Sequence, residues 1–437
     1  MKDQKNKDNL SREKWGRIEI EFPSKTHLFL LLAIVVPYLI ATGFVLGRID
    51  WHPSSTGKKT ETNQVATTSA PSAVRGIPLS PGPWGDMAYR RIFIQSPEDF
   101  LTLDAYESSD PRWFFGGENS RSNVLTQLTQ SGLNSEQRRQ LENASWAQTT
   151  NGLYLTPPTD FTLSLNPSTR QKIYTLLAHY TENPWQHYPC FFPAGNVEDL
   201  FAKDNLSLKS LALLKQLAYP HAHLLFFADL PLALHQIGDP AEKMRFAKAV
   251  SRRSTLLTGV RVNPDSNVDT LLAYWARAGQ GKDLRPLLEG ISKTPGAPLP
   301  LMAILPVRAA SRLFTFASPA MIPAERENPH WSAFNFFRDP PDDRYSDAAF
   351  MKQKLESDFY PVFSDPAYGD LVFLMTPAGG ILHSSVFIAD NIVYTKCGGQ
   401  FVAPWLLMTI PEMQEAFATM AKPDEQLKIM YYRNKYY

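Results

Sequence analysis

The feature that most constrains this chain is an uncharged apolar run near its N-terminus, HLFLLLAIVVPYLIATGFVL at residues 27–46. A helix of about 20 apolar residues spans the hydrocarbon core of a bilayer, so the run predicts a single transmembrane helix at residues 28–46. Pro37 is compatible with this interpretation because membrane helices tolerate a proline kink. A cleaved signal peptide is the alternative, but the apolar run is longer than a signal core and its small-residue cleavage spacing is poor.

The basic residues around this run indicate an orientation. Those before it are Arg12, Lys14, Arg17 and Lys25, and those after it are Arg48, Lys58 and Lys59. The slight excess on the N-terminal side favours residues 1–27 in the cytoplasm and the large C-terminal part outside. We therefore expect a single-pass bacterial inner-membrane protein that faces the periplasm. Because only Cys190 and Cys397 are present, there is no disulfide framework to identify the compartment.

Composition excludes one class of partner and suggests where folding begins. The chain of 437 residues has 44 basic and 43 acidic side chains without a long single-sign block, which argues against nucleic acid as a partner. Residues 47–85 are rich in Ser, Thr, Pro and Gly and predict a flexible linker. We expect folded structure in the two parts that follow, residues 86–320 and residues 321–437.

The middle part, residues 86–320, is predicted to be mainly α-helical with short apolar strands. One helix start is marked by Asp239 as N-cap, Pro240 at the first helical position and Glu242 three residues after the cap. Another helix has an apolar stripe at helical spacing, made of Val268, Leu271, Leu272 and Trp275. Walker-type loops, dinucleotide fingerprints and internal repeats are absent from this part of the sequence, so its pattern predicts no ligand.

The C-terminal part, residues 321–437, changes to one helix followed by short strands. The strand segments read GDLVFLM, HSSVFIAD and NIVYT, with the turn sequence TPAGG between the first two. A further helix and a last strand at Leu427 to Arg433 close the chain. A helix followed by a small antiparallel sheet is an α+β arrangement.

Two segments of this part match a known family in order and spacing. They are Gly369 to Phe373, and the strand carrying His383, Val386, Phe387, Ile388 and Asp390. In these residues the chain resembles the NlpC-type family of papain-like cell-wall cysteine peptidases, over about the last quarter of its length. The resemblance implies a papain-like domain in which a cysteine at a helix start faces a histidine on a strand.

The resemblance also assigns positions to the expected catalytic groups. It places His383 at the base position and Thr395, or its neighbour Lys396, at the third position that orients the base. The nucleophile position falls on Pro329, 40 residues before Gly369. Proline has no nucleophilic atom, so the thiol chemistry of the family is not expected here.

Several side chains near these positions are candidates for binding. We expect His330 and Trp331, on the same helix, and Arg344, in an Arg-x-Ser element with Ser346, to contribute to a binding surface. Ser332 is a weak alternative nucleophile, because a residue one turn along a helix does not point where the first residue points.

Other reactive side chains are predicted to be structural. Cys190 lies near His187 in the sequence, but flanking prolines and aromatics indicate a buried thiol and not the start of a helix. Cys397 follows the histidine strand and is predicted to be a turn residue. His221 and His223 are two residues apart without a second ligand set, so no metal site is predicted, and no cofactor is expected.

The sequence therefore predicts a membrane-anchored protein with a degenerate, non-catalytic NlpC-like domain that binds a peptide or protein, with a cell-wall peptide as one possibility. Two alternatives are an active cell-wall peptide hydrolase with a non-standard nucleophile and a structural scaffold protein.

Overall fold

The computed structural model describes residues 76–437 apart from 110, 118, 295–297, 318–326, 399–402 and 422–424. Within these ranges no helix is long and apolar enough to cross a membrane. The membrane helix predicted at residues 28–46 lies outside the described residues, so the α+β part of the expected fold class is observed without a membrane-spanning element. The expected inner-membrane location depends on that segment and stays a prediction.

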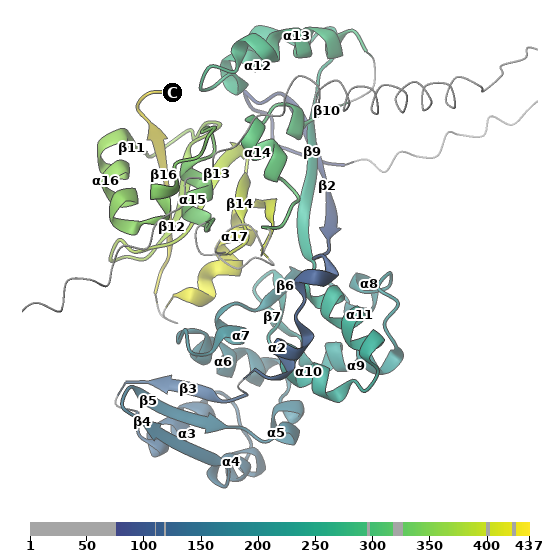
Figure 1. Ribbon diagram of the computed structural model, residues 1–437, viewed down its shortest axis with the longest axis vertical. Coiled ribbons are helices and arrows are strands. Elements are labelled where there is room, and N and C mark those ends of the chain that lie inside the picture. The colour runs from purple at the N-terminus through teal and green to yellow at the C-terminus, as the bar shows by residue number, and fades with distance from the viewer. Residues whose placement is uncertain are drawn as a thin grey trace, which may run out of the picture. The chain divides into compact units, whose positions relative to one another are not determined.

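The described chain combines helices with four antiparallel sheets (Figure 1). A four-stranded sheet has the order β1-β2-β9-β10, with β1 at Ile77–Pro78, β2 at Asp86–Ile94, β9 at Arg253–Arg261 and β10 at Leu299–Pro300. A three-stranded sheet has the order β3-β5-β4, with β3 at Trp113–Gly116, β4 at Ser145–Thr149 and β5 at Gly152–Thr156. A second has the order β6-β8-β7, with β6 at Cys190–Pro193, β7 at Tyr219–His221 and β8 at Leu224–Phe227.

The largest sheet has six strands in the order β11-β16-β12-β13-β14-β15. These strands are β11 at Phe359–Val362, β12 at Leu371–Met375, β13 at Ile381–Ala389, β14 at Ile392–Lys396, β15 at Trp405–Thr409 and β16 at Lys428–Asn434. The last strand in the chain therefore inserts between β11 and β12. Because β16 pairs with both neighbours, the strands of the C-terminal part form one continuous sheet.

Helices of the N-terminal two thirds connect and cover the smaller sheets. They are α2 at Leu103–Glu107, α3 at Arg121–Gln130, α4 at Ser135–Glu142, α5 at Thr159–Ser164, α6 at Pro167–Ala178, α7 at Pro184–His187, α8 at Val197–Leu200, α9 at Leu208–Leu217, α10 at Leu230–Gln236, α11 at Pro240–Ser251, α12 at Val268–Trp275 and α13 at Gly281–Ser292. Toward the C-terminus follow α14 at Val307–Arg312, α15 at Pro329–Phe334, α16 at Ala348–Asp358 and α17 at Ile410–Phe417. Single 3₁₀ turns are η1 at Glu98–Phe100, η2 at Leu301–Ala303, η3 at Asp343–Ser346 and η4 at Ala418–Met420.

The expected fold of the middle part, mainly helical with short apolar strands, must be corrected to α+β, because β2 and β9 are nine-residue strands that pair along their whole length. Residues 86–320 contain β2 to β10, which belong to three antiparallel sheets, as well as α2 to α14. Several of these strands are only four residues long, such as WFFG in β3 and LLFF in β8. A short apolar run of this kind has no periodicity that separates a buried strand from a buried helix segment, which is why the sequence pattern was misleading.

The predicted linker also ends earlier than expected. Within residues 47–85, β1 pairs with β2 through Ile77 opposite Tyr89, and the backbone oxygen of Trp84 accepts a hydrogen bond of 3.1 Å from the Trp275 indole. Backbone pairing and an aromatic anchor therefore give the chain defined structure before residue 86.

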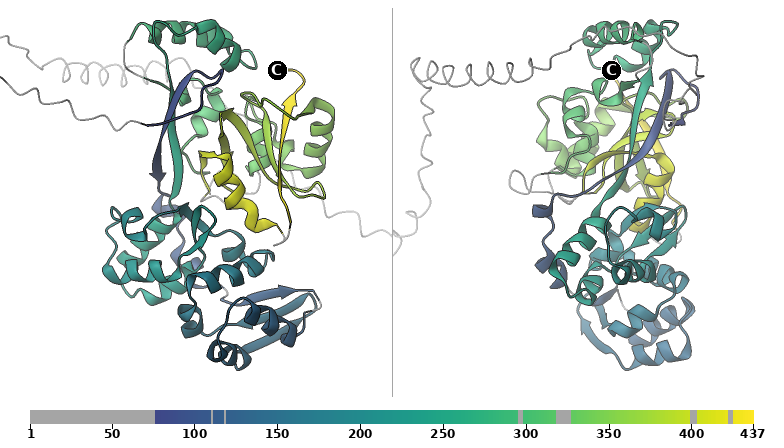
Figure 2. Two further views of the ribbon diagram at one scale, coloured as in Figure 1. Left: turned by 180° about the vertical axis from the view of Figure 1, so that it is seen from behind. Right: turned by 90° about the vertical axis from the view of Figure 1, so that its right-hand side faces the viewer.

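The six-stranded sheet is covered on both faces by different cores. One core contains Leu371, Phe373, Val386, Ile388, Tyr394 and Leu407 together with residues of α15 and α16. The other contains Val372, Leu374, Phe387, Val393, Leu406 and Met408 together with residues of α17. The two sets alternate along each strand, as side chains of a pleated sheet must. Figures 1 and 2 show α15 and α17 on opposite faces of this sheet.

Candidate functional site

Helix α15 begins at Pro329, the position that the family resemblance assigns to the nucleophile. Asn328 is its N-cap, and its Oδ1 accepts a hydrogen bond of 2.8 Å from the backbone N–H of Trp331. Proline suits the first helical position because its fixed φ is helical and its missing N–H has no intrahelical partner there. The local sequence therefore builds a capped helix start, but the residue at this start carries no reactive atom.

Strand β13 presents Ser384, and not His383, to α15. The Oγ of Ser384 lies 2.6 Å from Nδ1 of His330, the second residue of the helix. Trp331 packs in the same core as Val386, which is two residues along β13 from Ser384 and so on the same face. The side chain of Ser384 is fully buried. On its α15 face, β13 thus presents the hydroxyl of Ser384 at the position where the family resemblance implies an imidazole.

His383 faces the opposite side of the sheet. Its ring stacks on Phe417 of α17 with centroids 3.6 Å apart, and its Nε2 lies 2.7 Å from Oγ1 of Thr395. Only 1% of the residue is exposed. Burial, followed by the nearby charge of His330, lowers the pKa of His383 well below its ordinary value. His383 is therefore a neutral core histidine under physiological conditions.

The expected pairing of His383 with the helix start at Pro329 must be corrected. The structure brings His383 and Thr395 together, as the third-position assignment requires, but it places both on the α17 face. A shift of one residue along a strand moves a side chain to the other face of the sheet. The order and spacing of the strand motif do not detect this shift.

Lys396, the other candidate for the third position, lies on the α15 face. It is fully buried, its Nζ donates a hydrogen bond of 2.9 Å to the backbone oxygen of Gly398, and its Nζ is 5.4 Å from the Trp405 ring centroid. Burial is the main cause that lowers the pKa of Lys396 to about 8. A buried ammonium next to an aromatic face is a costly arrangement that only its partners make tolerable.

The remaining polar groups beside α15 are engaged in structural contacts. Ser332 accepts a hydrogen bond of 2.9 Å from the indole Nε1 of Trp405, so its hydroxyl holds the helix to β15. Arg312 of α14 forms a 2.6 Å ion pair with the buried Glu327 and lies 4.8 Å from the Trp405 ring centroid. These contacts fix α14, α15 and β15 together and leave Ser332 in a bonded, buried position.

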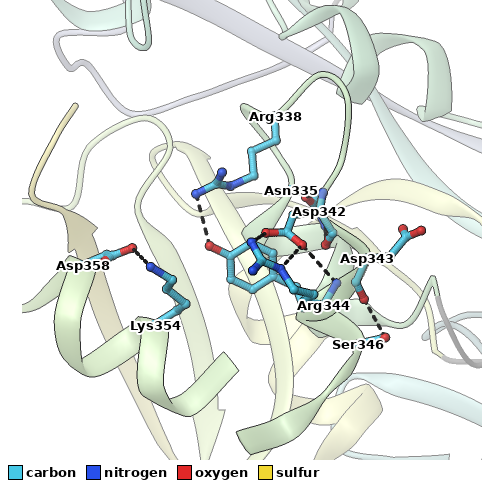
Figure 3. Close-up of polar contacts among 9 residues, drawn as sticks. Asn335, Arg338, Asp342, Asp343, Arg344, Ser346, Lys354 and Asp358 are labelled. Carbon is cyan, nitrogen blue, oxygen red and sulfur yellow. Dashed lines mark hydrogen bonds and ion pairs between the residues drawn. The ribbon is translucent and has the colours of Figure 1, made fainter. Parts of the chain in front are cut away.

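Arg344 belongs to a loop that is held by its own side chains (Figure 3). Asn335 donates from Nδ2 to the backbone oxygens of Trp331 and Asp342, each at 3.1 Å, and accepts from the backbone N–H of Asp342 at 2.7 Å. The Asp342 carboxylate in turn accepts from Arg344 Nε at 2.9 Å and Nη2 at 2.7 Å. The Arg344 side chain is 70% exposed, so this expected binding residue is at the surface and is already paired with a neighbour.

The cysteines lie away from α15. Cys190 is in β6 and Cys397 directly follows β14, and both are buried and free. Burial is the main cause that raises the pKa of the Cys397 thiol, against the opposing effect of the nearby Arg253. His187, the neighbour that suggested a thiol–imidazole pair with Cys190, has its Nδ1 2.6 Å from the backbone oxygen of Ala178.

The histidines considered as metal ligands have other partners. His221 stacks on Phe226 at a centroid distance of 4.6 Å, and Nδ1 of His223 lies 2.5 Å from Glu415 Oε1. Among the residues that the structure describes, no group of three His, Cys, Asp or Glu side chains could hold a metal ion.

Comparison with protein-family models, with curated proteins and with solved structures found no match. Sequence reasoning missed the roles of Ser384 and Trp405 on the α15 face. The one signal that pointed to Ser384 was the run His-Ser-Ser in β13, which leaves open which of its residues faces the helix.

Proposed function

We propose that this chain is a non-catalytic protein that binds a peptide or another protein, and that its C-terminal part is a degenerate NlpC-like domain. Peptide hydrolysis by a cysteine thiol needs the nucleophile and a base within hydrogen-bond reach of each other. The observation that carries the proposal is the division of these groups between two faces. Pro329 begins the helix on one face of the sheet, and His383 is stacked on Phe417 on the other.

A serine-based hydrolase is the competing interpretation, since Ser384 and His330 are in contact. A nucleophile must approach the scissile carbonyl to about 3–3.5 Å in a near-attack geometry. Ser384 is fully buried between β13 and α15, so a substrate has no access to its Oγ in this arrangement. The contact is better explained as a hydrogen bond that positions the helix on the sheet.

The full-length protein tests the proposal directly. It is incubated with a synthetic cell-wall stem peptide and with a generic unfolded peptide substrate, and the products are analysed by mass spectrometry. We expect intact peptides at the level of the buffer control. Cleavage that disappears in Ser384→Ala, a change too small to open a large cavity, would instead identify a serine hydrolase.

Restoring a thiol gives a sharper prediction. Pro329→Cys places a cysteine at the start of α15, but the facing position on β13 remains Ser384. We expect no thiol-dependent hydrolysis from this variant, because His383 cannot reach across the sheet. The matched control is Pro329→Cys combined with His383→Phe, which should behave identically. Iodoacetamide-sensitive cleavage by the single variant that the second substitution abolishes would contradict the assigned register.

A further inference from the structure

A cavity of about 400 Å³ lies in the middle part of the chain, away from α15. Its walls come from the α2–β3 connection, from Pro157 and α5, from α7 and from α10, and it is here called the α7–α10 cavity. Small-molecule and peptide side-chain sites commonly have volumes of about 300–1,000 Å³. The α7–α10 cavity is therefore large enough for a ligand.

Three carboxamides line the α7–α10 cavity, those of Asn183, Gln186 and Gln236, and the first two differ in how they are used. Asn183 accepts from the backbone N–H of Phe114 at 2.8 Å and donates to the oxygens of Phe114 and Leu177 at 2.9 Å each. Gln186 is only 8% exposed, yet its carboxamide makes no hydrogen bond to any of the residues that the structure describes. Gln186 lines the cavity and its amide atoms are not sealed from it, so both the donor and the acceptor of this amide are open to a ligand there.

The floor of the cavity is a preorganised carboxylate. Asp229 Oδ1 accepts from the Tyr174 hydroxyl at 2.5 Å, and Oδ2 accepts from Arg170 Nη1 at 2.5 Å. Arg170 also donates from Nη2 to the backbone oxygen of Thr162 at 2.7 Å. A carboxylate has about four acceptor positions, so Asp229 keeps capacity for a donor from the cavity. Because Arg170 already balances the negative charge of Asp229, this carboxylate favours a neutral N–H group of a ligand over a cation.

Apolar groups form most of the remaining wall. Trp113 and Trp185 line it, and each is held edge-on by another ring, Trp113 by Phe161 at 6.0 Å and Trp185 by Tyr106 at 5.5 Å. Pro157, Pro184, Pro231 and Leu232 complete this apolar wall. Rigid aromatic and proline surfaces bind an apolar side chain at low entropic cost.

The charges at the cavity rim are engaged within the protein. Glu107 forms an ion pair with Lys243, and the Arg112 guanidinium lies 4.5 Å from the Tyr154 ring centroid. Among the lining residues that the structure describes, Gln186 offers a donor and an acceptor and Asp229 offers an acceptor beside an apolar wall, while Glu107 and Arg112 already have partners. This combination matches a peptide group that carries an apolar side chain.

We propose that the α7–α10 cavity binds a short uncharged peptide segment, whose backbone amide pairs with Gln186 and whose next N–H donates to Asp229. An apolar side chain of the same segment packs between Trp113 and Trp185. The inference rests on the proposed peptide-binding function and names the site and the ligand chemistry for it. It also moves binding away from the NlpC-like part of the chain.

The test uses the full-length protein and the probe N-acetyl-Leu-Ala-amide in isothermal titration calorimetry. A ligand of this size reaches a Kd on the order of 0.1–1 mM in a well-formed site. We expect saturable binding in that range and a change in tryptophan fluorescence. An analogue in which an ester replaces the central amide lacks the N–H donor and should bind at least about tenfold more weakly.

Gln186→Leu is the critical variant because it keeps the volume and removes only the carboxamide. Since that group has no hydrogen bond to the described residues, the melting temperature should stay the same or rise, while the Kd of the probe rises at least about tenfold. Asn183→Leu is the matched structural control, because it removes three hydrogen bonds and should lower the melting temperature. Gln130→Leu, an exposed change at the end of α3, should alter neither quantity.

Several results would overturn the inference. They are no saturable binding of the probe, probe binding that Gln186→Leu leaves unchanged, and N-acetylglucosamine binding at the same site where the peptide does not bind. A fall in melting temperature for Gln186→Leu as large as that for Asn183→Leu would mean that Gln186 is structural. These outcomes differ from failure of the proposed function, which is shown by peptide cleavage whether or not the cavity binds.

Discussion

His383 gives the most direct test of the register of β13, in which Ser384 and not His383 faces α15. If His383 is a neutral core residue, it must destabilise the fold when the solution becomes acidic. Its pKa in the folded state is lowered well below the ordinary value of about 6.5, which applies when the chain is unfolded. Between pH 6.5 and the lowered pKa of the folded state, the unfolded chain therefore binds more protons at this position than the folded chain does.

The size and sign of the effect follow from linkage. The stability that a neutral buried histidine contributes is fully present above pH 6.5 and is lost as the pH falls. Each histidine of this kind lowers the free energy of unfolding by about 1.4 kcal/mol per pH unit between its two pKa values. Between pH 7.5 and 5.5, His383 therefore lowers the free energy of unfolding, by an amount on the order of 1 kcal/mol. His330 and His221, whose pKa values burial also lowers, add to the acid sensitivity of the whole protein.

His383→Phe isolates the contribution of one residue. At pH 7.5 the variant retains the stack on Phe417 but loses the contact with Thr395, which costs about 0.5–1.5 kcal/mol. At pH 5.5 it avoids the proton linkage, so it should become as stable as the unmodified protein or slightly more stable. Urea denaturation followed by circular dichroism at pH 7.5, 6.5 and 5.5 measures the difference in the free energy of unfolding between His383→Phe and the unmodified protein.

Phe417→Leu is the matched control because it removes the stacking partner and leaves the imidazole in place. It should lower the free energy of unfolding by about 1 kcal/mol at each pH without removing the dependence on pH. A constant difference between His383→Phe and the unmodified protein across this range would refute the reasoning. That result would mean that His383 is solvated in the folded protein, as a base on an open groove would be.

The buried pair of Arg170 and Asp229 should respond to single and double changes in different ways. Asp229→Leu leaves the fully buried Arg170 guanidinium without its counterion and should lower the free energy of unfolding by about 3–5 kcal/mol. Arg170→Met combined with Asp229→Leu should lower it clearly less. Equal losses in thermal or urea unfolding would argue against a desolvated pair. Gly369 has φ of +90°, and an added Cβ would approach Cε2 of Phe337 to 2.4 Å. Gly369→Ala should therefore lower stability by about 1–3 kcal/mol, and a variant of unchanged melting temperature would contradict the described turn.

Local patterns in the sequence correctly predicted those elements that neighbouring residues are sufficient to specify. Helix α12 spans Val268–Trp275, as the apolar stripe indicated, and α11 begins at Pro240 with Asp239 accepting hydrogen bonds from the next backbone N–H groups. The last strand was expected at Leu427 to Arg433 and is β16 at Lys428–Asn434. Capping, helical periodicity and β-propensity act over a few residues, so they can be read without tertiary contacts.

The arrangement of these elements depended on contacts between distant residues. Strand β16 pairs with both β11 and β12, and Arg170 meets Asp229 across 59 positions of the chain. Neither contact leaves a periodic signal, because each depends on which surfaces are buried together. The helical interpretation of residues 86–320 failed for the same reason, since short apolar strands acquire their identity from the sheet that they join.

The sequence by itself determined that a proline begins α15 and that a histidine lies in β13, which was enough to question thiol catalysis. Only the tertiary structure decided that Ser384 faces the helix and that His383 packs against Phe417. The physical reason is the two-residue period of a strand, in which a change of one position exchanges the two faces of the sheet. The packing of α15 and α17 on those faces selects the register, and with it the chemistry that the site can perform.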